Sequence, residues 1–410
     1  MNPSKSNISV LKQIVKLIPP KLIDRLADKH EVSEHCRSIS PTCHVVAMLY
    51  GQLSHSAGLN DICDSLHNHS GVLSQVRGAT PMSKNGLSTA NSTRTADMAE
   101  ELFWNVLNSL TDSFPVFITK GRKYPGIPRR FKRTINAIDS TTMQLVANCM
   151  DWAKHRRRKA AAKLHLRLNV GSFLPECIIV CHAKDHDSKK AWGLCAGMKS
   201  GEIAVFDKAY VNFAHLYNLH SRGIFWVTRA KDNMAYDTVG QQAAKSTNII
   251  RDDRIKLTGT KAQEQYSDEL RLIEATVEVD GKPKVMTFIT NNMEWAPSSI
   301  CDLYRCRWAI EVFFKEMKQT LQLADFMGYS ENAVRWQIWI ALLAYLLLRF
   351  IAWQSKWKHS FNRLITAIRS VIWNYFNMYS VLECCGTAGG LARMQSDIEQ
   401  LYLPGFAQKA

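Results

Sequence analysis

The sequence predicts an α/β protein whose core of strands and helices is flanked by helical regions at both ends of the chain. Apolar residues recur at the spacing of helices through roughly the first 118 residues. Between residues 134 and 228 the pattern changes to short apolar runs, several of them alternating, with a helical segment before the last run. Helical spacing returns after residue 297. A middle region in which strands and helices alternate is typical of an α/β layer.

Short helices separated by polar turns are expected in the N-terminal region. Apolar residues have helical spacing in 8–17 and 45–53, and Ser, Asp and Asn residues that can cap helices occur in 60–66 and 83–91. Such helices can form a helix-turn-helix that reads DNA, and they can equally form a helical scaffold. Both interpretations stay open at this point.

Two segments are strongly basic. The connector 120–133 carries seven Lys and Arg residues around Pro125 and Pro128, so we expect it to be exposed. The run 151–163 is densely basic and leads into an alternating strand. Each segment can lie along the phosphates of a nucleic acid or form a solvated stretch of chain.

The middle of the chain is predicted to contain two groups of strands. The strands of the first group are 134–139, 164–170, 175–182, 203–206 and 223–228, with a helix at 212–220. The second group lies within 231–297, with strands at 253–258, 270–279 and 284–290. Asp280-Gly281 is a strong hairpin signal between the last two strands. We therefore expect a β-rich insertion before the helices of the C-terminal half.

Composition limits the class of protein. The net charge of +16 suggests a polyanionic partner, which favours a nucleic acid. The 11 cysteines include no CxxC pair and are expected to be reduced thiols of a cytoplasmic protein. The N-terminus has no convincing signal peptide, and the uncharged run 336–348 is shorter than the roughly 20 residues that span a bilayer. We expect a buried core helix there and no membrane partner.

A single predicted helix carries a carboxylate between basic residues. At about 100° per residue, four polar side chains fall within an arc of roughly 60°. They are Tyr304, Arg307, Glu311 and Lys318. A carboxylate can hold a metal ion and the flanking cations can hold a phosphate, so this face suggests chemistry on a phosphodiester backbone.

Two further carboxylates follow predicted strands. Asp139 ends the strand 134–139, and Asp207 follows the strand 203–206. Side chains at strand ends of an open α/β sheet point into the crevice where ligands bind. Together with Glu311 they could hold two Mg²⁺ ions about 3.5–4 Å apart, an arrangement that supports in-line displacement at phosphorus. Taken singly, an Asp in such a place is more often a turn or a helix cap, and a Glu between Arg and Lys is usually part of a solvated ion-pair face.

The helix matches the pattern Y-(2)-R-(3)-E-(6)-K at every position, and it resembles the signature of DDE transposases of bacterial insertion sequences, the insertion sequence 4 group. The wider match includes Ile138-Asp-Ser-Thr and Phe206-Asp-Lys-Ala-Tyr, and it extends from about residue 130 to about residue 355. Residues 40–95 resemble the N-terminal region of the family more loosely. Many relatives have Arg-Gly-Tyr where this chain has Lys208-Ala209-Tyr210, so the freedom of a glycine is absent from this turn.

The resemblance implies a fold, an activity and a set of site residues. It implies an RNase H-like catalytic core interrupted by a β-rich insertion, and cut-and-paste movement of DNA. Water frees a 3′-hydroxyl at the element end, and in relatives a hairpin intermediate precedes joining to the target. Asp139, Asp207 and Glu311 would be catalytic and would ligate two Mg²⁺ ions, for which Mn²⁺ can substitute. Tyr304, Arg307 and Lys318 would bind DNA near the cleaved end. The expected partners are double-stranded DNA, as element terminal repeats and target, and a second copy of the chain in a homodimeric synaptic complex.

The expected organisation has five parts. They are a helical, DNA-binding N-terminal region 1–120, the first part of the core 130–230, the β-rich insertion 231–297, the helices 298–355 that carry Glu311, and a helical C-terminal region 356–410. Two other functions remain open. One is a DNA-binding relative that has lost catalysis, and the other is an RNase H-like nuclease without strand transfer.

Some other polar residues are candidates for the same site. Lys163 and His165 resemble a Lys-x-His of the family near the active site, and a structural role is as plausible. His182 and Asp185-His-Asp187 could hold a metal, although polar loop residues are the favoured interpretation. Trp295 could stack on a flipped base as in relatives, but a core or surface role is preferred.

Overall fold

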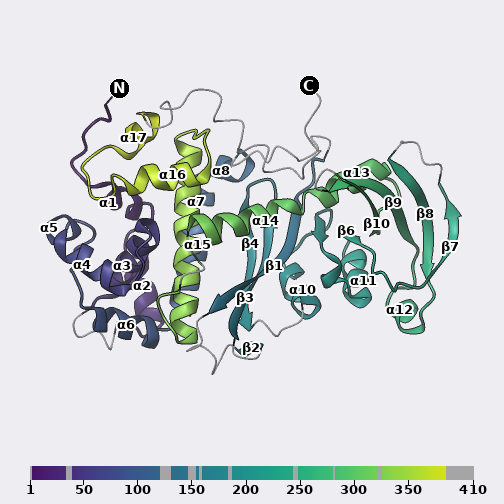
Figure 1. The fold of residues 1–410 in the computed structure, drawn as a ribbon, viewed down its shortest axis with the longest axis horizontal. Coiled ribbons are helices and arrows are strands. Elements are labelled where there is room, and N and C mark those ends of the chain that lie inside the picture. The colour runs from purple at the N-terminus through teal and green to yellow at the C-terminus, as the bar shows by residue number, and fades with distance from the viewer. Residues whose placement is uncertain are drawn as a thin grey trace. The chain divides into compact units, whose positions relative to one another are not determined.

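The structure is a computed structural model, and it describes residues 2–33, 39–120, 131–145, 154–156, 159–182, 187–242, 248–279, 282–321, 323 and 326–384. The chain divides into two compact units (Figure 1). One unit comprises residues 1–121, 143–162 and 314–394, and the other comprises residues 122–142, 163–313 and 395–410.

The first unit is helical, as the spacing of apolar residues predicts. Its N-terminal helices are α1 Val10–Val15, α2 Leu22–Lys29, α3 Pro41–Ser54, α4 Leu59–Asn68, α5 Ser70–Leu73, α6 Lys84–Thr93, α7 Asp97–Ser113 and α8 Pro115–Lys120. Its C-terminal elements are the π-helical turn Glu316–Thr320, α15 Glu331–Gln354, α16 Phe361–Arg369 and α17 Met378–Cys384. The short strand β2 Lys154–Arg156 pairs with the beginning of β3.

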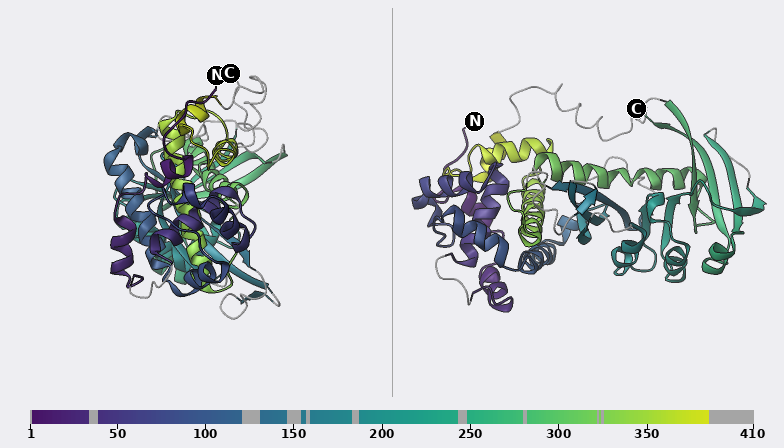
Figure 2. Two further views of the ribbon diagram at one scale, coloured as in Figure 1. Left: turned by 90° about the vertical axis from the view of Figure 1, so that its left-hand side faces the viewer. Right: turned by 60° about the horizontal axis from the view of Figure 1, so that its bottom comes forward.

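The long helix α15 is the centre of this unit (Figures 1 and 2). Ser330 begins it by accepting a hydrogen bond from Ala333 N at 3.1 Å. It packs against α3, α6, α7 and α16, which come from both ends of the chain. The helix has 24 residues, so it extends well beyond the apolar run 336–348 and is long and apolar enough to cross a membrane by length and composition. However, 83% of its most apolar stretch is buried inside the protein, which confirms the prediction of a core helix.

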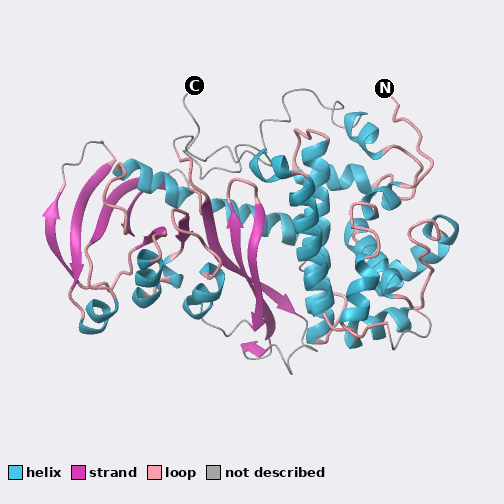
Figure 3. Cartoon of the chain, turned by 180° about the vertical axis from the view of Figure 1, so that it is seen from behind, coloured by secondary structure: helices cyan, strands magenta, loops and turns pink. Residues whose placement is uncertain are grey.

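The second unit is built on a sheet (Figure 3). Its strands are β1 Ile135–Leu145, β3 Lys159–Asn169, β4 Leu174–His182, β5 Ile203–Phe206, β6 Phe225–Arg229, β7 Tyr236–Gln241, β8 Ile249–Leu257, β9 Leu270–Val279 and β10 Lys282–Thr290. Its helices are α10 Asp187–Cys195, α11 Phe213–Ser221, α12 Thr260–Gln265, α13 Pro297–Arg305 and α14 Trp308–Lys315, with a 3₁₀ turn Lys208–Tyr210. β1, β3 and α14 extend across the division between the units.

The order of strands identifies the core. β1, β5 and β6 are parallel neighbours, with β3 next to β1 and β4 next to β3. All four residues of β5 are buried, as expected for a central parallel strand. α10 and α11 contribute Leu194 and Leu216 to the same apolar cluster as Phe206. This is the mixed α/β core that the sequence predicts.

The β-rich insertion is an extension of the core sheet. β7, β8, β9 and β10 form an antiparallel series, and β10 pairs with β6. The predicted hairpin turn at Asp280-Gly281 lies outside the described residues, but the strands on either side pair from Val279↔Lys282 onward. The insertion therefore shares one continuous set of backbone hydrogen bonds with the core.

A buried ion pair connects the insertion to the start of α13. Arg271 on β9 donates two hydrogen bonds of 2.7 Å to the carboxylate of Asp252 on β8, and each side chain is only 2% exposed. The same guanidinium donates to the carbonyl of Trp295, two residues before α13, at 2.5 Å. Because both charges are buried, each requires the other to offset its loss of hydration.

Asp252→Ala should therefore lower the free energy of unfolding by about 3–5 kcal/mol, since it leaves the Arg271 guanidinium buried without its counter-charge. Urea denaturation followed by tryptophan fluorescence measures the change. Glu269→Ala is the matched control, because Glu269 pairs with Arg254 at 3.6 Å in a largely exposed position and should contribute no more than about 1 kcal/mol. Equal effects of the two substitutions would contradict the assignment of a buried, coupled pair.

Candidate active site

Two of the predicted acids are adjacent because of strand register. β1 and β5 pair in parallel up to Ile138↔Phe206. Asp139 and Asp207 are the next residue of each strand segment, so they lie side by side where the parallel pairing ends. The sequence pattern predicted that Asp139 ends its strand. In fact β1 continues to Leu145, and only its pairing with β5 stops, because β5 ends at Phe206.

Asp207 leads into a tight turn. Its carbonyl accepts from Tyr210 N at 3.0 Å, which closes the 3₁₀ turn Lys208–Tyr210. Ala209 within this turn is not among the described residues with positive φ, so a glycine is not required there. The substitution of Ala for the glycine of many relatives is thus compatible with the local backbone. Lys208 pairs with Asp232 at 2.8 Å.

The third acid lies on an interrupted helix. We predicted one continuous helix through residues 304–318, and this was wrong. α13 ends at Arg305, and the backbone N–H groups of Cys306, Arg307, Ala309 and Ile310 bond to carbonyls three residues back. Three residues per turn brings Tyr304 and Arg307 to the same side of the chain, with the guanidinium carbon 5.7 Å from the tyrosine ring centroid. The face is therefore made by a tight turn followed by α14.

Arg307 joins two of the carboxylates. Its Nη1 donates to Asp139 Oδ2 at 2.8 Å, and its Nη2 donates to Glu311 Oε1 at 2.5 Å. The side chain is only 17% exposed. Burial alone would lower the pKa of the guanidinium, but the neighbouring Tyr304, Glu311 and Asp139 raise it instead. Arg307 is therefore a permanent cation between the two acids.

Asp139 is the acid most affected by its surroundings. Its Oδ1 accepts from Ser140 N at 2.8 Å. Burial raises its pKa to about 6, against the opposing effects of Arg307 and of the Ser140 hydrogen bond. The charges of Glu311 and Asp207 raise it further, which places three carboxylates within electrostatic reach of one another. A pKa of this kind is common where like charges gather at functional sites.

Tyr304 links the helix to the remaining acid. Its hydroxyl donates to Asp207 Oδ1 at 3.1 Å, and its ring packs on Phe288 of β10 with centroids 5.0 Å apart. Burial raises the pKa of Tyr304 to about 12, so this hydroxyl is a donor at neutral pH. Tyr304 and Arg307 together contact all three acids: Asp139, Asp207 and Glu311.

The donor set suits a hard divalent cation, although it is not arranged around one here. Three carboxylates from β1, the end of β5 and α14 offer the oxygen ligands that Mg²⁺ prefers. Within the described ranges, no three His, Cys, Asp or Glu side chains form a ready metal-binding group. Arg307 occupies the position of a counter-ion between Asp139 and Glu311.

A second polar network is connected to Asp139 through the next residue, Ser140. The sequence patterns did not predict that its members contact one another. Asp187 Oδ1 accepts from Ser140 Oγ at 2.9 Å and pairs with Lys163 Nζ at 2.6 Å. His165 lies 3.6 Å from the same oxygen and 3.1 Å from the hydroxyl of Tyr210. The sequence contains separate signals for its members, namely the position of Ser140 directly after Asp139, the Lys163-x-His165 pattern and the polar residue Asp187. Lys163 and His165 are thus near the acids through Ser140 and Asp187.

The structure shows the positions of some of the remaining candidate residues but not of others. Lys318 is in the π-helical turn of the first unit, where burial lowers its pKa, and its role stays a prediction. Trp295 packs on Phe131 and Phe225, with ring centroids 5.5 and 4.9 Å apart. Asp185, His186 and the side chain of His182 lie outside the described residues, as do residues 121–130, 151–153 and 157–158 of the two basic segments.

Two family models match parts of the chain. The family model described as "Transposase DDE domain" matches residues 130–347, more than half of the chain, and it includes all three acids. A second model, described as a domain of unknown function, matches residues 6–76.

Curated relatives agree with this assignment. A Sinorhizobium fredii protein provisionally named transposase y4zB is 31% identical over 55% of this chain and 62% of its own length. A probable transposase for the insertion sequence element IS5377 of Geobacillus stearothermophilus is 27% identical over 63% of this chain and 66% of its own length. Transposase InsG for the element IS4 of Escherichia coli is 25% identical over 41% of this chain and 38% of its own length. The matches thus span less than two thirds of the length of these relatives.

Among solved structures, a synaptic complex of the piggyBac transposase with hairpin DNA covers 100% of this chain and 89% of its own, with a TM-score of 0.43 and 9% identity. The family model is the stronger finding, because it matches the segment that carries Asp139, Asp207 and Glu311. The chain belongs to the DDE transposase family, among the relatives of the IS4 group of insertion sequences.

Proposed function

We infer that this protein is a cut-and-paste DNA transposase, which hydrolyses phosphodiesters at the ends of an insertion sequence and joins the freed ends to target DNA. The observation that carries this proposal is the gathering of Asp139, Asp207 and Glu311 around Tyr304 and Arg307. Family membership supports it, since the matching domain is that of DDE transposases.

In this proposal the three carboxylates hold two Mg²⁺ ions, with Mn²⁺ as a substitute. When bound, such ions activate the attacking oxygen and stabilise the leaving oxygen of an in-line displacement. Asp139 would be the central ligand of the set, since it neighbours Asp207 by strand register and shares Arg307 with Glu311. Ser140 fixes one of its oxygens by a backbone hydrogen bond and leaves the other directed at Arg307.

Arg307 has two roles that exclude each other. In the metal-free protein it neutralises Asp139 and Glu311. If the carboxylates held a divalent cation, Arg307 would lose both acceptors, and its two free donors would suit a phosphate of the DNA. Tyr304, Arg307 and Lys318 are the proposed DNA contacts near the scissile bond.

The proposed partners are double-stranded DNA and a second copy of the chain. The net charge of +16 favours the first. Homodimer formation in the synaptic complex, and the five-part organisation with a DNA-binding region at 1–120, remain predictions. Cleavage products separate the inactive DNA-binding relative and the nuclease without strand transfer from the transposase.

The acids should be essential for cleavage. With labelled duplexes from the DNA flanking the gene, the wild-type protein and Mg²⁺ should give nicked and joined products. Asp139→Asn, Asp207→Asn and Glu311→Gln should each lower the cleavage rate more than about 100-fold, because each removes a charged oxygen ligand. Asp268→Asn, an exposed acid on the insertion side, is the control and should cut normally.

The products discriminate between the candidate functions. Binding without any product in Mg²⁺ or Mn²⁺ would establish the inactive relative. Cleavage without joined products would establish the nuclease. Full activity of the Asp139→Asn protein would show that this acid is not a metal ligand.

The affinity of the protein for divalent metal ions should fall as the pH is lowered. The pKa of Asp139 is about 6, so protons compete with metal below that pH and the carboxylate is free to bind above it. Calorimetric titration of the DNA-free protein with Mn²⁺ should show affinity that is constant above roughly pH 7 and declines below about pH 6. Arg307→Gln should move this decline to higher pH, because Arg307 is the group that lowers the pKa of Asp139. A decline at the same pH in both proteins would contradict the assignment to Asp139.

Lys318 should contribute one phosphate contact. Lys318→Ala is expected to weaken binding to duplex ends and to reduce the slope of log affinity against log salt by about one. Lys315→Ala changes an exposed lysine three residues earlier and serves as the matched control. Fluorescence anisotropy over a range of KCl concentrations measures both slopes, and equal slopes for Lys318→Ala and wild type would argue against the contact.

A further inference from the structure

A long stretch of the N-terminal region contains no carboxylate. The chain has 36 Asp and Glu residues among 410, yet none occurs from Ser65 to Ala96. The structure describes all of this stretch, which lies within one unit and includes α5 and α6. Its exposed residues are His67, Asn68, Ser70, Gly71, Ser74, Gln75, Gly78, Thr80, Ser83, Lys84, Asn85, Ser88, Thr89, Ser92 and Thr93. This surface therefore offers hydrogen-bonding groups and some positive charge, but no negative charge.

Helix α6 presents the densest part of this surface. Its exposed residues recur at i, i+1, i+4 and i+5, so they occupy one face. They are Lys84, Asn85, Ser88, Thr89, Ser92 and Thr93. Ser92 and Thr93 bond back to carbonyls of their own helix. Within the described part of the chain, the side chains of the other four make no hydrogen bond or ion pair.

This composition does not stabilise the helix. Asn, Ser and Thr are weaker helix formers than Ala, Glu, Lys or Gln, which usually fill exposed helical positions. Residues that act against local stability at solvent-facing positions are expected where the face has another task. A merely solvated face gives no reason for such a choice.

The opposite face of α6 is firmly anchored. Leu87 is fully buried, and the amide oxygen of Asn91 lies 2.7 Å from Nε2 of the buried His44. Burial lowers the pKa of His44 to about 3, so the ring is neutral. Gly86 approaches Ile39 so closely that a Cβ there would lie 2.4 Å from its Cδ1.

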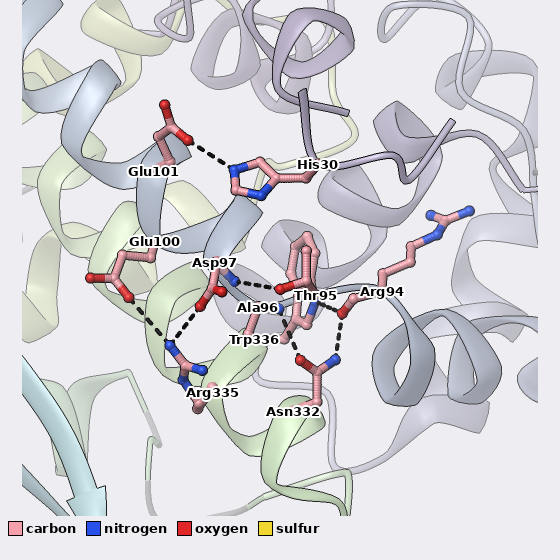
Figure 4. A network of polar contacts seen from close by, with 10 residues as sticks. All are labelled: His30, Arg94, Thr95, Ala96, Asp97, Glu100, Glu101, Asn332, Arg335 and Trp336. Carbon is pink, nitrogen blue, oxygen red and sulfur yellow. Dashed lines mark hydrogen bonds and ion pairs between the residues drawn. The ribbon is translucent and has the colours of Figure 1, made fainter. Parts of the chain in front are cut away.

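The end of α6 is fixed by α15 (Figure 4). Asn332 donates to the carbonyls of Asn91 and Arg94 and accepts from Ala96 N at 2.9 Å. Trp336 Nε1 donates to the carbonyl of Arg94 at 2.7 Å. Arg335 pairs with Asp97 at 2.8 Å. α6 is thus a rigid helix, and its polar face need not be ordered when it binds.

Double-stranded DNA is the partner that fits this face. Asn and Lys can make paired or single hydrogen bonds to the major-groove edges of adenine and guanine, and Ser and Thr can bond to bases or phosphates. No carboxylate on α6 itself repels the phosphate backbone. A protein partner would be matched by aromatic and apolar residues at the centre of the face, and α6 exposes none.

We propose that α6 enters the major groove of DNA and that Asn85 and Thr89 contact base edges there. This inference rests on the proposed function, since it names the element by which the transposase reads sequence. It goes further than the family comparison, because α6 lies between the two matched segments 6–76 and 130–347.

The inference is tested by finding which DNA sequences the protein binds under conditions in which it cannot cut them. Wild-type protein in EDTA selects duplexes from a library with a random core of about 20 base pairs, and anisotropy then measures affinity for the selected duplex and a scrambled one. Asn85→Ala and Thr89→Ala should each bind the selected duplex about 5- to 100-fold more weakly, with little change on the scrambled one. Both variants should keep or raise the thermal midpoint, because alanine favours helix. Asn108→Ala, an exposed asparagine on α7, is the matched control and should behave as wild type.

Two results would overturn the inference. One is an unchanged motif and affinity in the Asn85→Ala, Thr89→Ala double variant. The other is an equal loss on selected and scrambled duplexes, which would indicate phosphate contacts alone. This outcome can be told apart from the test of cleavage. If the protein selects a motif through α6 but cuts no DNA, this inference stands and the proposed function fails. If the protein cuts DNA but its binding does not depend on α6, the proposed function stands and this inference fails.

Discussion

The double ion pair of Arg307 is the interaction on which the candidate site depends. Three acids from separate elements repel one another, and the charges of Glu311 and Asp207 add to the effect of burial, which is the main cause of the raised pKa of Asp139. Arg307 and the hydroxyl of Tyr304 offset the repulsion, because between them they contact every one of the three acids. The three acids are therefore held close together with compensating groups already in place.

The fold was predictable where local pattern decides it. The buried run of β5, the alternation in β3 and the apolar length of α15 all predicted the correct element, since each pattern reflects one burial environment. The candidate acids were also identified from sequence. The contact of Arg307 with Asp139 was not, because it joins residues 168 positions apart and depends on tertiary packing.

The wrong prediction of one continuous helix through residues 304–318 also has a physical explanation. The helix through residues 304–318 contains no Pro or Gly that would announce its interruption at Cys306. The break is made by carbonyls that accept at three rather than four residues, and its effect is to bring Tyr304 and Arg307 together. Similarly, the polar composition of α6 indicates from sequence only a potential for helix capping. The role of this polar composition becomes clear only when the structure shows which end of α6 is held by α15 and which of its residues remain exposed.

The seam between β6 and β10 has a mechanical consequence. Thr228 of β6 pairs with Phe206 on one side and with Ile289 of β10 on the other. Strand pairing thus continues from the outermost strand β7 to the residue that precedes Asp207, with register shifts in the β7–β8 and β8–β9 pairs. Backbone hydrogen bonds of one sheet therefore couple the insertion to the candidate acids mechanically.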